Sequence, residues 1–73
     1  MTKQEANDLV KKAKSYINQK VTIKEVEYKF TNISPISCVS ENMKEMCKVN
    51  GMLLDAKNET LIYPLSLIIK AFG

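Results

Sequence analysis

The chain of 73 residues contains no histidine, no arginine and no tryptophan, and its eleven cationic side chains are all lysines. Without histidine there is no side chain whose ordinary pKa lies near neutrality, so the commonest general base and metal ligand is missing. Without arginine there is no planar group that grips a phosphate or a carboxylate through two hydrogen bonds. These absences argue against a metalloenzyme or a triad hydrolase, and they predict that the chain is not an enzyme.

Glycine and cysteine are also scarce. Gly51 and Gly73 are the only glycines, too few for the loops that cradle phosphates in P-loop or Rossmann-type proteins. The two cysteines, Cys38 and Cys47, cannot complete a zinc shell within one chain that lacks histidine. We therefore expect no metal and no cofactor, and we expect both cysteines to be buried, reduced thiols. A zinc site shared between two subunits is the less favoured alternative.

Long apolar runs are absent as well. The longest strongly apolar run, residues 67–69, is far too short to span a bilayer, and the polar start of the chain does not resemble a signal peptide. We expect a cytoplasmic protein with no membrane partner. The length predicts a single domain over residues 1–73. A domain this small hides only about 60% of the surface of its unfolded chain, so we also expect a homo-oligomer.

Two helices are predicted, one at each end of the chain. Thr2 and Glu5 have the spacing of a capping box, and apolar residues then recur every three or four positions, which predicts an amphipathic helix over about residues 2–19. Ile68, Ile69 and Phe72 have helical spacing in a short segment, about residues 65–72, that is apolar nearly all round. Such a helix must be covered, either by the strands or by a second subunit. We predict these three residues as an oligomer interface.

Strands are predicted between about residues 20 and 65, where β-branched and aromatic residues alternate with polar ones. A slip in this alternation at Lys24-Glu25 indicates a bulge or a tight turn. Asn50-Gly51 is typical of a type I′ hairpin turn, and the alternative is one long strand with a bulge at Gly51. Residues 37–48 have no clear period, and we interpret them as either a mobile loop or a short helical turn.

The predicted fold is α+β: an N-terminal amphipathic helix, a strongly bent four- to five-stranded antiparallel sheet or small barrel, and a short C-terminal helix. In residues 21–23, 26–30 and 61–66 the rhythm of the strands resembles the small SH3-like barrels of phages and other mobile elements. That resemblance implies a binding module rather than an enzyme. It transfers no functional residue.

Two groups of side chains are candidates for binding. Lys3, Lys11 and Lys14 lie on one stripe of the first helix, where they suit a phosphate backbone, although an ordinary solvated helix face is the simpler interpretation. Met43 and Met46 lie in the segment without a clear period. Methionine adapts to irregular partners, and filling the core is its alternative role.

These observations together predict a small non-catalytic interaction module that binds, and so blocks or sequesters, a partner protein or a small anionic ligand. Lysine, asparagine and isoleucine make up about a third of the chain, a bias associated with AT-rich genomes. The size and the composition fit a phage or mobile-element inhibitor of host machinery, such as an anti-defence protein acting in the host cytoplasm. The alternative is a lysine-dependent nucleic-acid-binding module of SH3-like type.

Overall fold

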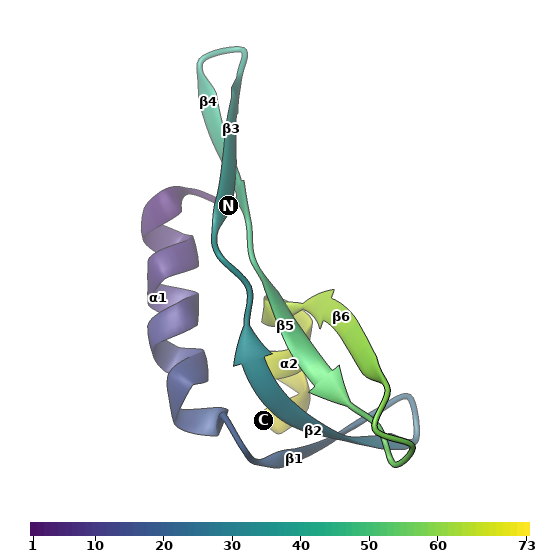
Figure 1. Ribbon diagram of the computed structural model, residues 1–73. Helices are drawn as coiled ribbons and strands as arrows, with labels where there is room; N and C mark the ends of the chain where they lie inside the picture. The colour runs from purple at the N-terminus through teal and green to yellow at the C-terminus, as the bar shows by residue number, and fades with distance from the viewer.

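Two helices and six strands follow one another in the computed structural model, which describes residues 1–73. The elements are α1 (Lys3–Ala13), β1 (Lys20–Ile23), β2 (Val26–Ile33), β3 (Ser37–Glu41), β4 (Lys44–Lys48), β5 (Asn50–Leu54), β6 (Thr60–Pro64) and α2 (Leu65–Phe72). The strands form a four-stranded antiparallel sheet in the order β1-β2-β5-β6 and a separate β3-β4 pair (Figure 1). The predicted α+β class, with a helix at each end and an antiparallel sheet between them, is confirmed.

The predicted capping box starts α1. The Thr2 hydroxyl oxygen accepts a hydrogen bond from the Glu5 N–H at 3.2 Å, and the Glu5 carboxylate accepts one from the Thr2 N–H at 3.1 Å. Hydrogen bonds from the backbone N–H of Thr2, and then from its side chain, hold the pKa of Glu5 below its ordinary value. A 3₁₀ turn over Lys14–Tyr16 continues the helix, and Asn18 with φ of 73° marks the turn into the sheet.

The tight turn predicted at Lys24-Glu25 joins β1 to β2. Both residues have positive φ, 50° and 67°, as the type I′ turns of two-residue hairpins require. The turn therefore reverses the chain within two residues. The phase slip in the sequence arises because these two residues belong to neither strand.

The hairpin turn predicted at Asn50-Gly51 is wrong. Both residues lie in β5, and Gly51 does not have a positive φ. The chain runs extended from β4 into β5 with a break only at Val49, which is nearer to the alternative of one long strand. The bulge of this sheet is not at Gly51 but on β2, where the register with β5 shifts between Phe30 and Asn32.

Gly51 is glycine because α2 packs directly on it. A Cβ at this position would lie 2.5 Å from Cδ1 of Ile68 and 2.8 Å from Cε1 of Phe30. Both of those side chains are fully buried, so neither has free space beside it. The residue serves the close approach of a helix to a strand rather than a turn.

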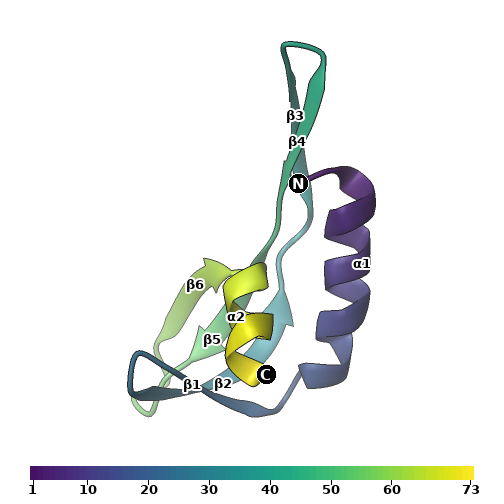
Figure 2. The same ribbon diagram turned by 180° about the vertical axis from the view of Figure 1, so that it is seen from behind.

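The core lies between the inner face of the four-stranded sheet and the two helices. α2 contacts β1, β5, β6 and α1, and Figure 2 shows it lying across the sheet. Ile68 and Ile69 are buried within the chain, and the half-buried Phe72 stacks on Tyr16 with ring centroids 4.5 Å apart. The chain itself covers α2, so the reason for placing a subunit contact at these residues disappears. The assembly of the chain stays a prediction.

Residues 37–48 form neither a loop nor a short helix, and that prediction is wrong. They form the β3-β4 hairpin, with Asn42 and Met43 in its turn at φ of 50° and 63°. The hairpin extends beyond the core and gives the molecule its elongated shape of 42 × 20 × 19 Å (Figure 1).

Candidate binding surface

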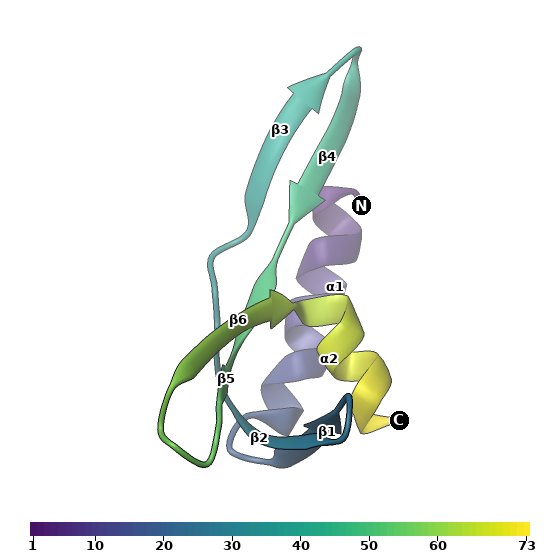
Figure 3. The same ribbon diagram turned by 90° about the vertical axis from the view of Figure 1, so that its right-hand side faces the viewer.

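The β3-β4 hairpin is the most exposed regular part of the molecule. All five residues of β3 are exposed, and β4 buries only Cys47. Figure 3 shows the two strands projecting past the N-terminus of α1, with nothing beside their outer half. Loops and hairpins on a rigid scaffold commonly carry binding function, so this projecting ribbon with two accessible faces is the candidate contact element.

A disulfide joins the two strands of the hairpin, and two hydrogen bonds fix the hairpin to the start of the chain. Cys38 and Cys47 are directly opposite each other in the register, with Cα atoms 4.0 Å apart, and they form a disulfide. The Cys47 N–H donates to the Met1 carbonyl oxygen at 2.7 Å, and the Lys3 N–H donates to the Glu45 carboxylate at 2.8 Å. Through Cys47 near its base and Glu45 nearer its turn, β4 is thereby tied to the start of the chain.

The expectation of two reduced, buried thiols is therefore wrong. Cys47 is buried, but Cys38 is exposed, and the two sulfur atoms are bonded to each other. The physical reason is the hairpin register, which places both cysteines at the same distance from the Asn42-Met43 turn. That equal spacing is the sequence signal that would have indicated the pairing.

One face of the hairpin carries its exposed apolar side chains. Val39 and Met46 are opposite each other in the register and therefore point to the same side, with 60% and 48% of their surface exposed. Met43, at the tip, is fully exposed. Sequence reasoning singled out Met43 and Met46 as binding candidates but missed Val39, which joins them only once the register is known.

The three lysines predicted to bind lie on a different part of the surface. Lys3, Lys11 and Lys14 are exposed along α1 and its 3₁₀ extension, and none of them forms an ion pair. The Lys3 backbone N–H contacts the hairpin through its bond to the Glu45 carboxylate of β4. Lys11 is in the last turn of α1 and Lys14 begins the 3₁₀ extension, and Figure 1 shows this end of the helix farther from the hairpin than its start. The structure thus does not gather the lysines and the methionines into one site.

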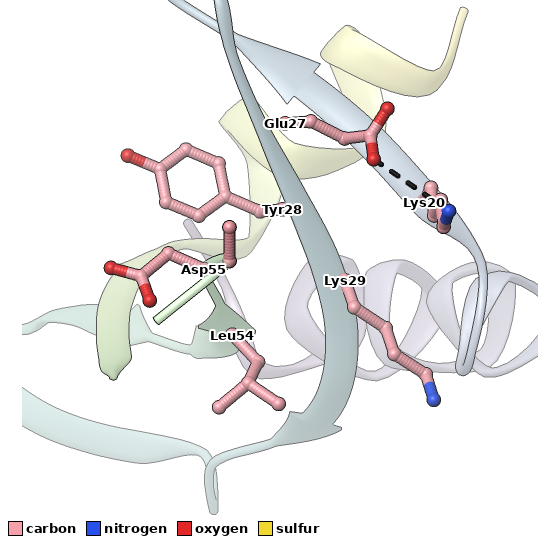
Figure 4. A pocket seen from close by; sticks show the side chains of 7 residues that line it. Lys20, Glu27, Tyr28, Lys29, Leu54 and Asp55 are labelled. Atoms are coloured by element: carbon pink, nitrogen blue, oxygen red, sulfur yellow. Dashed lines mark ion pairs between the residues drawn. The ribbon is translucent and has the colours of Figure 1, made fainter. Parts of the chain in front are cut away.

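An open depression of about 240 Å³ lies at the other end of the molecule, where β1 and β2 meet the end of β5. Figure 4 shows the Lys20–Glu27 ion pair at its rim, with the two charged atoms 3.7 Å apart and both side chains well exposed. Asp55 and Lys29 bring further charges of both signs. No residue predicted to bind lines this depression, and its mixed charges favour no ligand.

The chemistry of the surface is limited. No three histidine, cysteine, aspartate or glutamate side chains come together where a metal ion would bind. Neither helix has the length and the apolar character needed to cross a membrane. No protein-family model matches the chain, and neither the curated proteins nor the solved structures include a match.

Proposed function

We propose that the chain is a small non-catalytic interaction module that binds a partner protein through its β3-β4 hairpin. The observation that supports this most strongly is Met43. It has φ of 63° in a two-residue turn, and its side chain contacts nothing in the chain that would cover it. Positive φ disfavours a residue with a long side chain, and glycine is the preferred residue at this place in such turns.

Both residues of a two-residue hairpin turn have positive φ, as Lys24 and Glu25 do between β1 and β2, so the turn accounts for the backbone of Met43 but not for its exposed apolar side chain. The folded chain gains nothing visible from the Met43 side chain, whereas a partner would gain a flexible, polarizable apolar group at the end of a projection. Val39 and Met46 continue the apolar surface from the tip toward the base. We infer that the tip and this face enter an apolar groove on the partner.

The disulfide supports the same role. It cross-links β3 to β4 near the base of the hairpin, so the two strands stay paired before binding. A contact element that is already ordered loses less conformational entropy when it binds, and the affinity rises accordingly. A hairpin that fills a groove also blocks it, which gives a small chain an inhibitory effect without chemistry.

We therefore propose blocking or sequestration of the partner as the biological effect. The size and the lysine-, asparagine- and isoleucine-rich composition support the narrower proposal that the chain is a phage or mobile-element inhibitor of host machinery, such as a defence system. A small anionic ligand, held by the exposed lysines of α1, is a further proposed ligand of the same module.

The experiment is affinity capture with matched baits from a lysate of the cell in which the chain acts. The wild-type chain is compared with Met43→Gly, and with Lys57→Gly in the exposed turn between β5 and β6 as the control. We expect at least one protein to be retained by the wild type and by Lys57→Gly and lost with Met43→Gly. Identical retention by all three baits would count against binding through the tip.

The alternative function is nucleic-acid binding by Lys3, Lys11 and Lys14, supported by their exposure on one helix face without ion-pair partners. Contacts to several phosphates weaken steeply as salt rises. A gel shift at low salt separates this alternative from the first proposal. Nucleic-acid binding requires a complex that dissociates as salt is added and that still forms with the Met43→Gly variant.

A further inference from the structure

The outer edge of β3 is a free sheet edge. β3 pairs only with β4, and no backbone hydrogen bond of the turns, loops and caps involves residues 37–41. Figure 3 shows α1 lying toward the β4 side, so no other element covers this edge. Unpaired backbone N–H and C=O groups along a strand edge are a template for pairing with another strand.

The groups that face outward can be identified. Opposed residues in an antiparallel pair alternate between hydrogen-bonded and non-hydrogen-bonded positions. The Cys47 N–H points away from β3, because it donates to the Met1 carbonyl oxygen. Cys38–Cys47 is therefore a non-hydrogen-bonded pair, and so is Ser40–Glu45, two residues further along. It follows that the N–H and C=O groups of Cys38 and Ser40 point outward from the hairpin.

This edge has none of the features that commonly protect a strand edge. β3 contains no proline and no lysine, and its one charged residue, Glu41, is the last of the strand. The edges of the four-stranded sheet are different, since β1 begins with Lys20 and β6 ends with Pro64. Lysine and proline at an edge discourage further pairing, so β3 is the edge best suited to accept a strand.

We propose that a second copy of this chain pairs antiparallel along β3, with the two-fold axis at Val39. Cys38 of each copy then lies opposite Ser40 of the other, and their outward-facing groups form two hydrogen-bonded pairs. Val39 lies opposite Val39 at a non-hydrogen-bonded position, where side chains come closest. The two hairpins become one four-stranded ribbon.

The side chains favour this register over its neighbours. Two neighbouring registers would also pair the outward-facing N–H and C=O groups. One of them places Val39 opposite Ser37, and the other places Val39 opposite Glu41. The proposed register instead joins Met46, Val39 and the same two residues of the second copy into one apolar row across the ribbon. Ser37 faces Glu41 on both sides of that row, so no like charges are opposed.

The inference goes beyond the proposed function, because self-association is a property of the pure chain and leaves the apolar face of the hairpin open. The affinity of the dimer is limited by the small area of its interface. Two strands of five residues bury far less than the roughly 1,200 Å² typical of stable complexes, so the dimer is reversible and forms at high concentration. The oligomer predicted from the sequence is thereby assigned to β3 rather than to α2.

The experiment measures mass and backbone protection on the same samples of the oxidised chain. Sedimentation up to about 1 mM is expected to show conversion from 8.3 kDa monomers to dimers as concentration rises. Amide hydrogen exchange at Cys38 and Ser40 is expected to slow over the same concentration range. Protection at these two amides identifies β3 as the interface.

Ser40→Pro removes an outward N–H without removing a hydrogen bond to β4, and Ser40→Ala keeps that N–H as the matched control. Two hydrogen bonds are lost per dimer, so Ser40→Pro is expected to raise the dimer dissociation constant roughly 10- to 100-fold. Ser40→Ala is expected to leave it unchanged. A wild-type monomer at 1 mM, a dimer that Ser40→Pro leaves intact, or unprotected Cys38 and Ser40 amides would overturn the proposal. If Ser40→Pro fails to fold, the wild-type exchange data decide alone.

Discussion

Substituting Gly51 by alanine tests the packing of α2 on the sheet most sharply. The added Cβ would lie 2.5 Å from Ile68 Cδ1, 2.8 Å from Phe30 Cε1 and 3.3 Å from Leu65 Cδ1. Overpacking of a full core costs about 1–3 kcal/mol, while the loss of glycine flexibility in the unfolded chain returns about 0.4–1 kcal/mol. We expect the free energy of unfolding to fall by about 1–2 kcal/mol. The melting temperature should then fall by roughly 4–15 °C.

A double-mutant cycle with Ile68→Val isolates the contact responsible. Ile68→Val alone removes Cδ1 and is expected to cost about 0.5–1.5 kcal/mol. In the Gly51→Ala background the same change removes the closest steric contact. The double variant should therefore lose about 1 kcal/mol less free energy of unfolding than the two single variants lose together. Urea denaturation followed by circular dichroism measures all four proteins.

Two results would refute this reasoning. If Gly51→Ala left stability unchanged or raised it, α2 would not approach β5 as closely as the structure has it. If the two substitutions were simply additive, the contact would not be the cause. The stability loss should also be independent of protein concentration, because Ile68 packs within the chain; an interface residue would make it concentration-dependent.

Two further predictions concern α1 and the hairpin. The pKa of Glu5 is lowered by folding, so its contribution to stability is present above the unfolded value of about 4.5 and is lost as pH falls through the lower folded value. Glu5→Gln keeps an acceptor for the Thr2 N–H without titrating, so its stability difference from wild type in urea denaturation should shrink as the pH falls below about 4.5. A difference that stays constant with pH would contradict the assignment. Reducing the Cys38–Cys47 disulfide, whose cysteines are separated by 9 in sequence, should cost roughly 2–3 kcal/mol in hairpin stability on the chain-entropy model. Hydrogen exchange should accelerate in β3 and β4 while β2 and β5 stay protected; equal loss in all four strands would show that the hairpin is not a separate unit.

The parts of the fold that were predictable depend on local chemistry. Thr2 and Glu5 start α1 through contacts three residues apart, and the spacing of the apolar residues in α2 follows from helix geometry alone. The turn at Lys24-Glu25 left a visible slip in the alternation because alternate residues of β1, and Phe30 of β2, are buried on the inner face of the sheet. In each case the signal and its cause lie within a few residues.

The parts that failed depend on contacts between distant residues or on the lack of a buried face. Asn50-Gly51 has the composition of a turn, but Gly51 is glycine because the Ile68 and Phe30 side chains leave no space for a Cβ. No local sequence pattern reveals these two contacts. The β3-β4 hairpin is exposed on nearly all sides, so the alternation that marks a half-buried strand has no reason to appear. Its turn is formed by Asn42 and Met43, and methionine at positive φ is no turn signal.

The candidate site was only partly predictable for the same reason. Met43 and Met46 were identified by residue type, and the structure places both on the exposed hairpin. Val39 and the Cys38–Cys47 disulfide could be identified only once the register of β3 with β4 was known. The lysines of α1 are exposed as expected, but their spacing along the helix said nothing about where the apolar candidates would lie. The function of both groups remains a prediction that binding experiments must test.

The central claim is that the Met43 tip exists for a partner rather than for the fold. The most direct measurement compares the wild type with Met43→Gly in calorimetric titration against the captured protein, with thermal unfolding of both chains. We expect Met43→Gly to be as stable as the wild type or more stable by up to about 1 kcal/mol, because glycine accepts positive φ freely. We also expect the affinity to fall at least about tenfold. Unchanged affinity with unchanged or higher stability would contradict the claim.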